Sequence, residues 1–110
     1  SRNRRDQRGP YVELTGPVAL SDDEERAIFA VVDAAVGIAG RTFVMMALRG
    51  SRAEKVRRLG VVDQPGHGFY ARRSEEEVLA RIDTCFHRGW LRFVRTREGL
   101  PLISYTEAGF

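Results

Sequence analysis

The stretch WLRFVRTREGLPLISYT, residues 90–106, decides the fold, because its hydrophobic pattern differs from that of the chain before it. Residues 90–96 and 101–106 are rich in aromatic and β-branched side chains, which favour strands. The REGL segment between them, residues 97–100, is typical of a turn. The stretch therefore predicts a β-hairpin.

Helical segments precede the hairpin. Each places apolar side chains on one stripe and stops near a glycine, and together they cover residues 22–36, 41–49, 52–59 and 75–88. Three begin with a serine followed three residues later by a glutamate, at 21–24, 51–54 and 74–77. This is the pattern of a capping box, in which the serine hydroxyl and the glutamate carboxylate accept reciprocal amide hydrogen bonds. Helix-turn-helix helices followed by a β-hairpin wing predict an α+β fold of the winged-helix class.

Length and composition are those of one globular domain, with 110 residues, 43% hydrophobic and 30% charged. Residues 1–20 hold a basic run and two Gly-Pro pairs without helical periodicity, so we expect a basic, flexible arm there and the domain at 21–110. No apolar run approaches the roughly 20 residues of a membrane span. Cys85 is the only cysteine, which excludes an internal disulfide and favours a cytoplasmic protein.

A second stretch, LRGSRAEKVRRLG at residues 48–60, gathers five cations around the single acid Glu54. A helix over 52–59 that buries its apolar side chains leaves Arg52, Lys55 and Arg58 on the outer side. A solvated helix usually neutralises such a row with glutamates at i,i+4 spacing, and exposed amides at a helix start suit a phosphate. We therefore predict a nucleic-acid backbone contact made by Arg49, Gly50, Ser51, Arg52, Lys55 and Arg58.

The hairpin turn repeats this pattern more weakly, with Arg95 and Arg97 opposed only by Glu98. We expect both arginines to assist the contact. His67 lies between glycines and His87 lies two residues from Cys85, so neither histidine has the convergent neighbours that a metal or a catalytic site requires. The sequence predicts no enzyme, no cofactor, no metal and no small-molecule substrate.

Three segments together also resemble a known family: LRGSRAEKVRRLG, GFYARRSEEEVLARIDTCFHRGWLRF and PLISYTEAGF. They are similar to the RQC domain, the winged helix that follows the helicase core in RecQ-type helicases, and most of all to the small stand-alone bacterial branch called RQC-minor. The resemblance covers about residues 24–110. It implies a nucleoid-associated protein that binds double-stranded or branched DNA, with the loop and helix matching Arg49–Arg58 on the phosphates and the wing at the terminal base pair.

The sequence departs from the family at the wing tip, because RTREGLP contains no aromatic side chain. We therefore expect DNA binding without strand separation. A different class of function also fits, namely a winged helix that docks an acidic protein partner through its basic face; salt dependence on bare duplex DNA separates the two. A major-groove reader is a third reading, and Glu75, Glu76 and Glu77 argue against it because they would repel phosphates at the start of helix 75–88.

Overall fold

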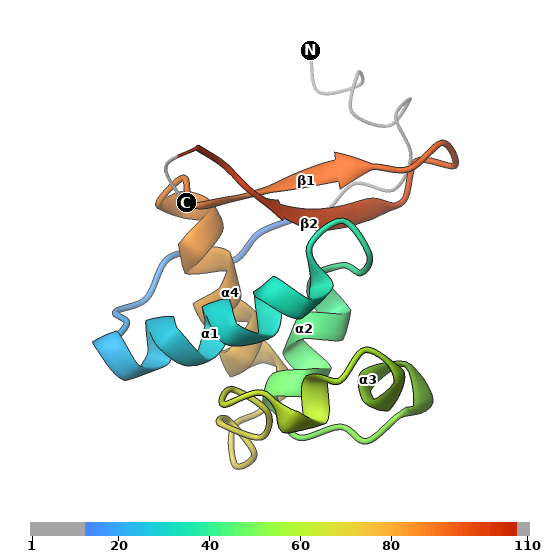
Figure 1. Ribbon diagram of the computed structural model, residues 1–110. Coiled ribbons are helices and arrows are strands. Elements are labelled where there is room, and N and C mark those ends of the chain that lie inside the picture. Colours follow the sequence, from blue (N-terminus) through green and yellow to red (C-terminus); the bar gives the residue numbers. More distant parts are fainter. Residues whose placement is uncertain (1–12, 108–110) are drawn as a thin grey trace.

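The computed structural model describes residues 13–107. Its elements follow in the order α1 (Asp22–Ala35), α2 (Arg41–Leu48), α3 (Glu54–Arg58), the 3-10 helix η2 (Val61–Asp63), α4 (Glu75–His87), β1 (Leu91–Arg95) and β2 (Pro101–Tyr105). The two strands pair antiparallel, with Leu91 opposite Tyr105 and Arg95 opposite Pro101. The hairpin lies across one end of the helices (Figure 1). The predicted α+β winged-helix fold is confirmed.

Two of the three capping boxes form as predicted, and they fix the starts of α1 and α4. Ser21 and Glu24 exchange hydrogen bonds of 3.1 and 2.9 Å at the start of α1. Ser74 and Glu77 do the same at the start of α4, at 3.1 and 3.0 Å. Both helices therefore begin at the residue after the serine.

The third capping box does not form, and the predicted helix over 52–59 is wrong in its start and length. The helix α3 has five residues, its N-cap is Ala53, and no side chain caps it. The backbone amide of Ser51 donates a hydrogen bond to the Met46 carbonyl at 2.9 Å. It therefore cannot donate to the Glu54 carboxylate, as a capping box requires. Glu54 instead lies 3.5 Å from Arg58. Ala53, which the pattern placed inward, is exposed.

The core lies between α1, α2, α4 and the inner face of the hairpin. Its fully buried side chains include Ile28 of α1, Val44 and Leu48 of α2, Ile82 of α4 and Ile103 of β2. These residues come from all the long elements, so burial of their side chains couples the helices to the wing. The short α3 contributes Val56, which is 2% exposed.

The connection between α1 and α2 docks on the free edge of β2. Gly37 donates to the Ile103 carbonyl at 3.0 Å, and Ile103 donates to the Ala39 carbonyl at 2.9 Å. A Cβ on Gly40 would lie 2.8 Å from the Pro101 carbonyl oxygen, so this close approach requires glycine. The wing is therefore held to the helices by backbone hydrogen bonds as well as by its buried side chains.

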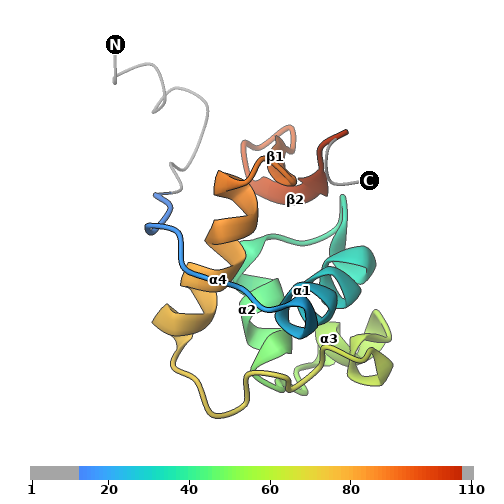
Figure 2. The same ribbon diagram turned by 90° about the vertical axis from the view of Figure 1, so that its left-hand side faces the viewer.

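Residues 13–20 lie along α4 (Figure 2). The amide and hydroxyl of Thr15 donate to Asp83 at 2.8 and 2.9 Å, and the amide of Val18 donates to the Thr84 hydroxyl at 2.9 Å. This part of the predicted arm is thus anchored to the domain, while residues 1–12 lie outside the described residues and their flexibility stays a prediction. Within residues 13–107, no helix is long and apolar enough to cross a membrane.

Candidate nucleic-acid interface

Two glycine-containing loops lie side by side at the C-terminal end of α2: the first, residues 49–53, follows α2, and the second, residues 64–74, precedes α4. Gly68 donates to the Ala47 carbonyl at 3.1 Å, and Tyr70 donates to the Leu48 carbonyl at 2.8 Å. The His67 ring donates from Nε2 to the Ser51 carbonyl at 2.8 Å. The histidine therefore holds the two loops together, which is a structural role.

The backbone amides that were expected to receive a phosphate are already used. Gly50, with φ of 95°, follows the end of α2, and its amide donates to the Ala47 carbonyl at 2.9 Å. The Ser51 amide donates to the Met46 carbonyl. These two hydrogen bonds form the Schellman motif that ends α2. The predicted cradle of free amides at Gly50 and Ser51 is therefore wrong, and any phosphate contact here must come from side chains.

Arg49 is half-buried and bound within the fold. Its Nε donates to the Arg73 carbonyl at 2.8 Å, and its Nη1 lies 3.6 Å from the Glu75 carboxylate. Arg49 thereby connects the end of α2 to the turn before α4. The structure places it next to the other predicted contact residues, but with part of its donor capacity already occupied.

The cations of α3 and the residue before it face solvent. Arg52, Lys55 and Arg57 are exposed, and no carboxylate among the described residues pairs with them. Arg58, also exposed, makes an ion pair of 3.5 Å with Glu54, a geometry that contributes little in water. The Lys55 ammonium lies 5.6 Å from the centre of the Phe43 ring on α2.

Two further exposed arginines, Arg57 and Arg72, were not among the predicted contacts. Arg57 of α3 is exposed. Arg72 lies in the second loop, is exposed, and has no ion-pair partner within residues 13–107. The Tyr70 amide donates to the Leu48 carbonyl and holds the segment before Arg72 against the end of α2, and a contact between segments so far apart leaves no local pattern in the sequence.

Most other arginines of the helices and of the turn before α4 lie near a carboxylate. Within the described residues, carboxylates lie within 4 Å of Arg26, Arg41, Arg73, Arg81 and Arg88. Among the described residues, the exposed cations for which no ion pair is found are Arg52, Lys55 and Arg57 at α3, Arg72 before α4, and Arg92 and Arg97 on the wing. Such a clustering of cations attracts polyanions.

The wing supplies the remaining predicted residues. Arg95 donates from Nη1 to the Gly99 carbonyl at 2.8 Å, which supports the hairpin turn. Arg97 is exposed in that turn. The wing turn and α3 lie on the same side of the molecule, with the connection between α1 and α2 in between (Figure 1).

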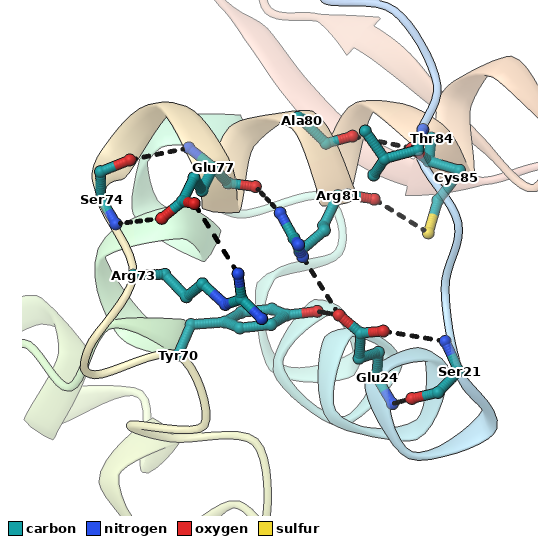
Figure 3. A network of polar contacts seen from close by, with 11 residues as sticks. Ser21, Glu24, Tyr70, Arg73, Ser74, Glu77, Ala80, Arg81, Thr84 and Cys85 are labelled. Carbon is teal, nitrogen blue, oxygen red and sulfur yellow. Dashed lines mark hydrogen bonds and ion pairs between the residues drawn. The ribbon is translucent and has the colours of Figure 1, made fainter.

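A polar network joins α1, the segment before α4 and α4 itself (Figure 3). Glu24 accepts from the Tyr70 hydroxyl at 2.8 Å and from Arg81 at 3.1 Å. Burial by itself would raise the pKa of Glu24, but the hydrogen bonds from Ser21, Tyr70 and Arg81 together lower it. Burial and the Glu24 carboxylate raise the pKa of Tyr70. The network therefore joins α1, the second loop and α4 through a carboxylate that stays charged.

Cys85 and His87 make contacts within the fold. Burial raises the pKa of the Cys85 thiol to about 12, so the thiol is protonated and unreactive at neutral pH. His87 donates from Nε2 to the Thr15 carbonyl at 2.5 Å. No group of three or more potential metal ligands lies together within residues 13–107.

The helix order and the C-terminal hairpin define a winged-helix domain. More specifically, the chain belongs to the RQC domain family, whose model matches residues 22–109. RQC domains are winged helices linked to DNA binding and are not catalytic by themselves. No curated protein and no solved structure matches the chain significantly.

Proposed function

We propose that this domain is a non-enzymatic DNA-binding module that grips the phosphate backbone of duplex or branched DNA. The main contacts are the side chains of Arg52, Lys55 and Arg58, with Arg57 and Arg72 as further contacts. The loop at Arg49, Gly50 and Ser51 sets the position of these side chains. Arg95 and Arg97 assist from the wing. One observation carries the proposal. Among the described residues, Arg52, Lys55 and Arg57 at α3 are exposed without an ion pair, whereas Arg26 of α1, Arg41 of α2 and Arg81 of α4 lie near carboxylates.

The charge of α4 supports backbone gripping over reading of the major groove. Its first turn carries Glu75, Glu76 and Glu77, all exposed. The backbone amide of Ser74 helps to lower the pKa of Glu77, which keeps that carboxylate ionised. Three negative charges at the end of a helix oppose its entry between two phosphate chains.

A salt titration tests the proposal. Fluorescence anisotropy of a labelled blunt duplex gives the affinity at several salt concentrations, and each phosphate contact contributes about −0.9 to the slope of log K against log salt. The five contacts outside the wing predict a slope of roughly −4 to −5. The control is Arg26→Ala on α1. It removes an exposed arginine whose guanidinium lies 3.5 Å from the Asp23 carboxylate. A flat salt response, or no binding at low salt, contradicts the proposal.

The same cations would also attract an acidic protein surface, which is the alternative function. The exposed apolar side chains of Ile38 and Leu100, at 51% and 53% exposure, lie close to the basic end and favour such a partner. Absence of DNA binding combined with a stable fold would support this alternative. Binding to chromosomal DNA would instead place the protein on the nucleoid of the cytoplasm.

A further inference from the structure

A small groove separates the basic helix α3 from the wing. It has a volume of about 310 Å³, and its walls include Ile38, Phe43, Lys55, Phe93 and Leu100. Ile38 and Leu100 are about half exposed, so the groove opens to solvent between two apolar lips. Phe43 of α2 and Phe93 of β1 supply aromatic surface inside.

The walls of the groove are fixed by backbone hydrogen bonds. The connection that carries Ile38 is tied to β2 through the Ile103 amide and the Ala39 carbonyl, at 2.9 Å. The turn that carries Leu100 is closed by the Thr96 amide, which donates to the Leu100 carbonyl at 2.9 Å. A groove built in this way is preformed, which lowers the cost of ordering it around a ligand.

Charge favours an anionic occupant. The described residues that line the groove include the cations Lys55 and Arg41 and no carboxylate. Arg41 is bound to Asp83, so Lys55 is the cation available at the groove. Arg52 and Arg58 lie three residues from Lys55 along the chain, and Arg97 lies in the wing turn three residues before Leu100.

Size favours a single flat group. A volume of about 310 Å³ lies at the small end of the roughly 300–1,000 Å³ of ligand pockets. An α-helix with its side chains is roughly 10–12 Å across and anchors over several turns, which needs a longer groove. One nucleobase between aromatic and aliphatic side chains, with its phosphate at a cation, matches both the size and the chemistry.

We propose that this groove binds one unpaired nucleotide at the end or branch point of a DNA duplex. The base lies against Phe43 and Leu100, and Lys55 contacts its phosphate. The inference rests on the proposed function, because a strand held by α3 on one side and by the wing on the other has to cross the mouth of the groove.

The test compares three DNA ligands by fluorescence anisotropy: a blunt duplex, the duplex with one added nucleotide on either strand, and the same duplex with that nucleotide abasic. The abasic ligand keeps the extra phosphate and removes only the base. Stacking predicts that the base-bearing overhang binds about fivefold to tenfold more tightly than the abasic one. 2-Aminopurine at the overhang should change its fluorescence on binding.

Variants then locate the base. Ile38→Ser combined with Leu100→Ser should abolish the preference for the base-bearing overhang and leave blunt-duplex affinity within about twofold, because it removes stacking surface and no cation. The matched control is Val18→Ser, which changes another exposed apolar side chain, 37% exposed, on the segment along α4. Phe43→Leu keeps an apolar wall and should lose most of the preference. Thermal unfolding of each variant checks the fold.

The outcomes separate this inference from the proposed function. Salt-dependent binding of the blunt duplex with equal affinity for the base-bearing and abasic overhangs overturns the inference alone and leaves the groove to a protein partner. Failure to bind the blunt duplex overturns the proposed function and the inference with it. If the double variant still prefers the base-bearing overhang, the base binds elsewhere and the inference about the groove is wrong.

Discussion

Asp83 of α4 is fully buried and accepts two hydrogen bonds from the Arg41 guanidinium at the start of α2, at 2.6 and 2.7 Å. The same carboxylate accepts from the amide and hydroxyl of Thr15. One buried charge therefore joins α2, α4 and the segment that precedes α1. Its oxygens are satisfied by four donors, which is the condition under which a buried ion pair is tolerated.

Removing one partner of this pair should destabilise the domain strongly. Asp83→Ala leaves the Arg41 guanidinium without its partner in a site where the arginine side chain is only 17% exposed. We expect a loss of about 3 kcal/mol in the free energy of unfolding, measured by urea denaturation. The double variant Arg41→Met/Asp83→Leu should recover much of that loss, because it leaves no unpaired charge. A loss below about 1 kcal/mol for Asp83→Ala would show that the pair does not hold the helices together.

Gly66 is required for reasons of space. A Cβ at this position would lie 2.1 Å from the Ala27 carbonyl oxygen and 2.9 Å from a methyl group of Val31, both on α1. Backbone cannot move aside as a side chain does, so Gly66→Ala should cost about 3 kcal/mol or more. Gly16→Ala is the control, since a Cβ there meets nothing within 4 Å. Equal thermal stability of the two variants would contradict the close packing of this loop on α1.

The serines test which helix starts are real capping boxes. Ser21→Ala removes a hydroxyl that accepts from Glu24 at the start of α1, and it should cost about 1 kcal/mol of stability. Ser51→Ala should cost less than about 0.5 kcal/mol, because Ser51 accepts only from the Ala53 amide, at 3.2 Å, and has no reciprocal glutamate. Chemical denaturation measures both. A larger loss for Ser51 than for Ser21 would restore the capping box that the sequence suggested.

Local signals in the sequence predicted most of the fold. Ser21 and Ser74 each precede a segment that forms a long helix, and both capping boxes are present as the pattern predicted. At Ser51 the backbone amide could either take part in a capping box with Glu54 or close the end of α2. In the structure it donates to the Met46 carbonyl and closes the end of α2. No rule applied to one segment at a time shows that outcome.

The candidate site was predictable only in part, for a similar reason. Arg52, Lys55 and Arg58 lie close together in the chain, so their clustering is visible in the sequence. Arg72 lies in a segment that the Tyr70 amide and the Leu48 carbonyl hold against the end of α2, and Arg41 meets Asp83 across 42 residues. Such contacts depend on the tertiary fold, which composition and spacing do not contain.

The basic helix should contribute more to DNA affinity than the wing. Arg52→Ala combined with Lys55→Ala removes two side chains without carboxylate partners, and it should reduce the salt slope by about 2. Arg95→Ala combined with Arg97→Ala should reduce it by less, because Arg95 already donates to the Gly99 carbonyl. Anisotropy titrations of one duplex at several salt concentrations give both slopes. The reverse order would move the principal contact to the wing.

The wing should bind DNA without opening it. Unstacking a base step costs a few kcal/mol, which a wing recovers by placing a flat or bulky side chain against the exposed base pair. The described wing turn, residues 96–100, contains no aromatic side chain. Its apolar residue, Leu100, lines the groove beside Ile38 instead. Arg97 offers charge and a guanidinium plane, which replaces less of the lost stacking than an aromatic ring.

The measurement uses 2-aminopurine placed within the terminal base pair of a blunt duplex, where it remains quenched while it is stacked and paired. At saturating protein we expect its fluorescence to stay near the paired level, because phosphate contacts by Arg52 and Lys55 need only an intact backbone. The fully single-stranded oligonucleotide sets the upper limit of the signal. Thr96→Trp is the matched gain-of-function variant, since an indole in the wing turn supplies the missing stacking surface and should raise the signal. A rise to the single-strand level with the unaltered protein would show that the wing separates the strands.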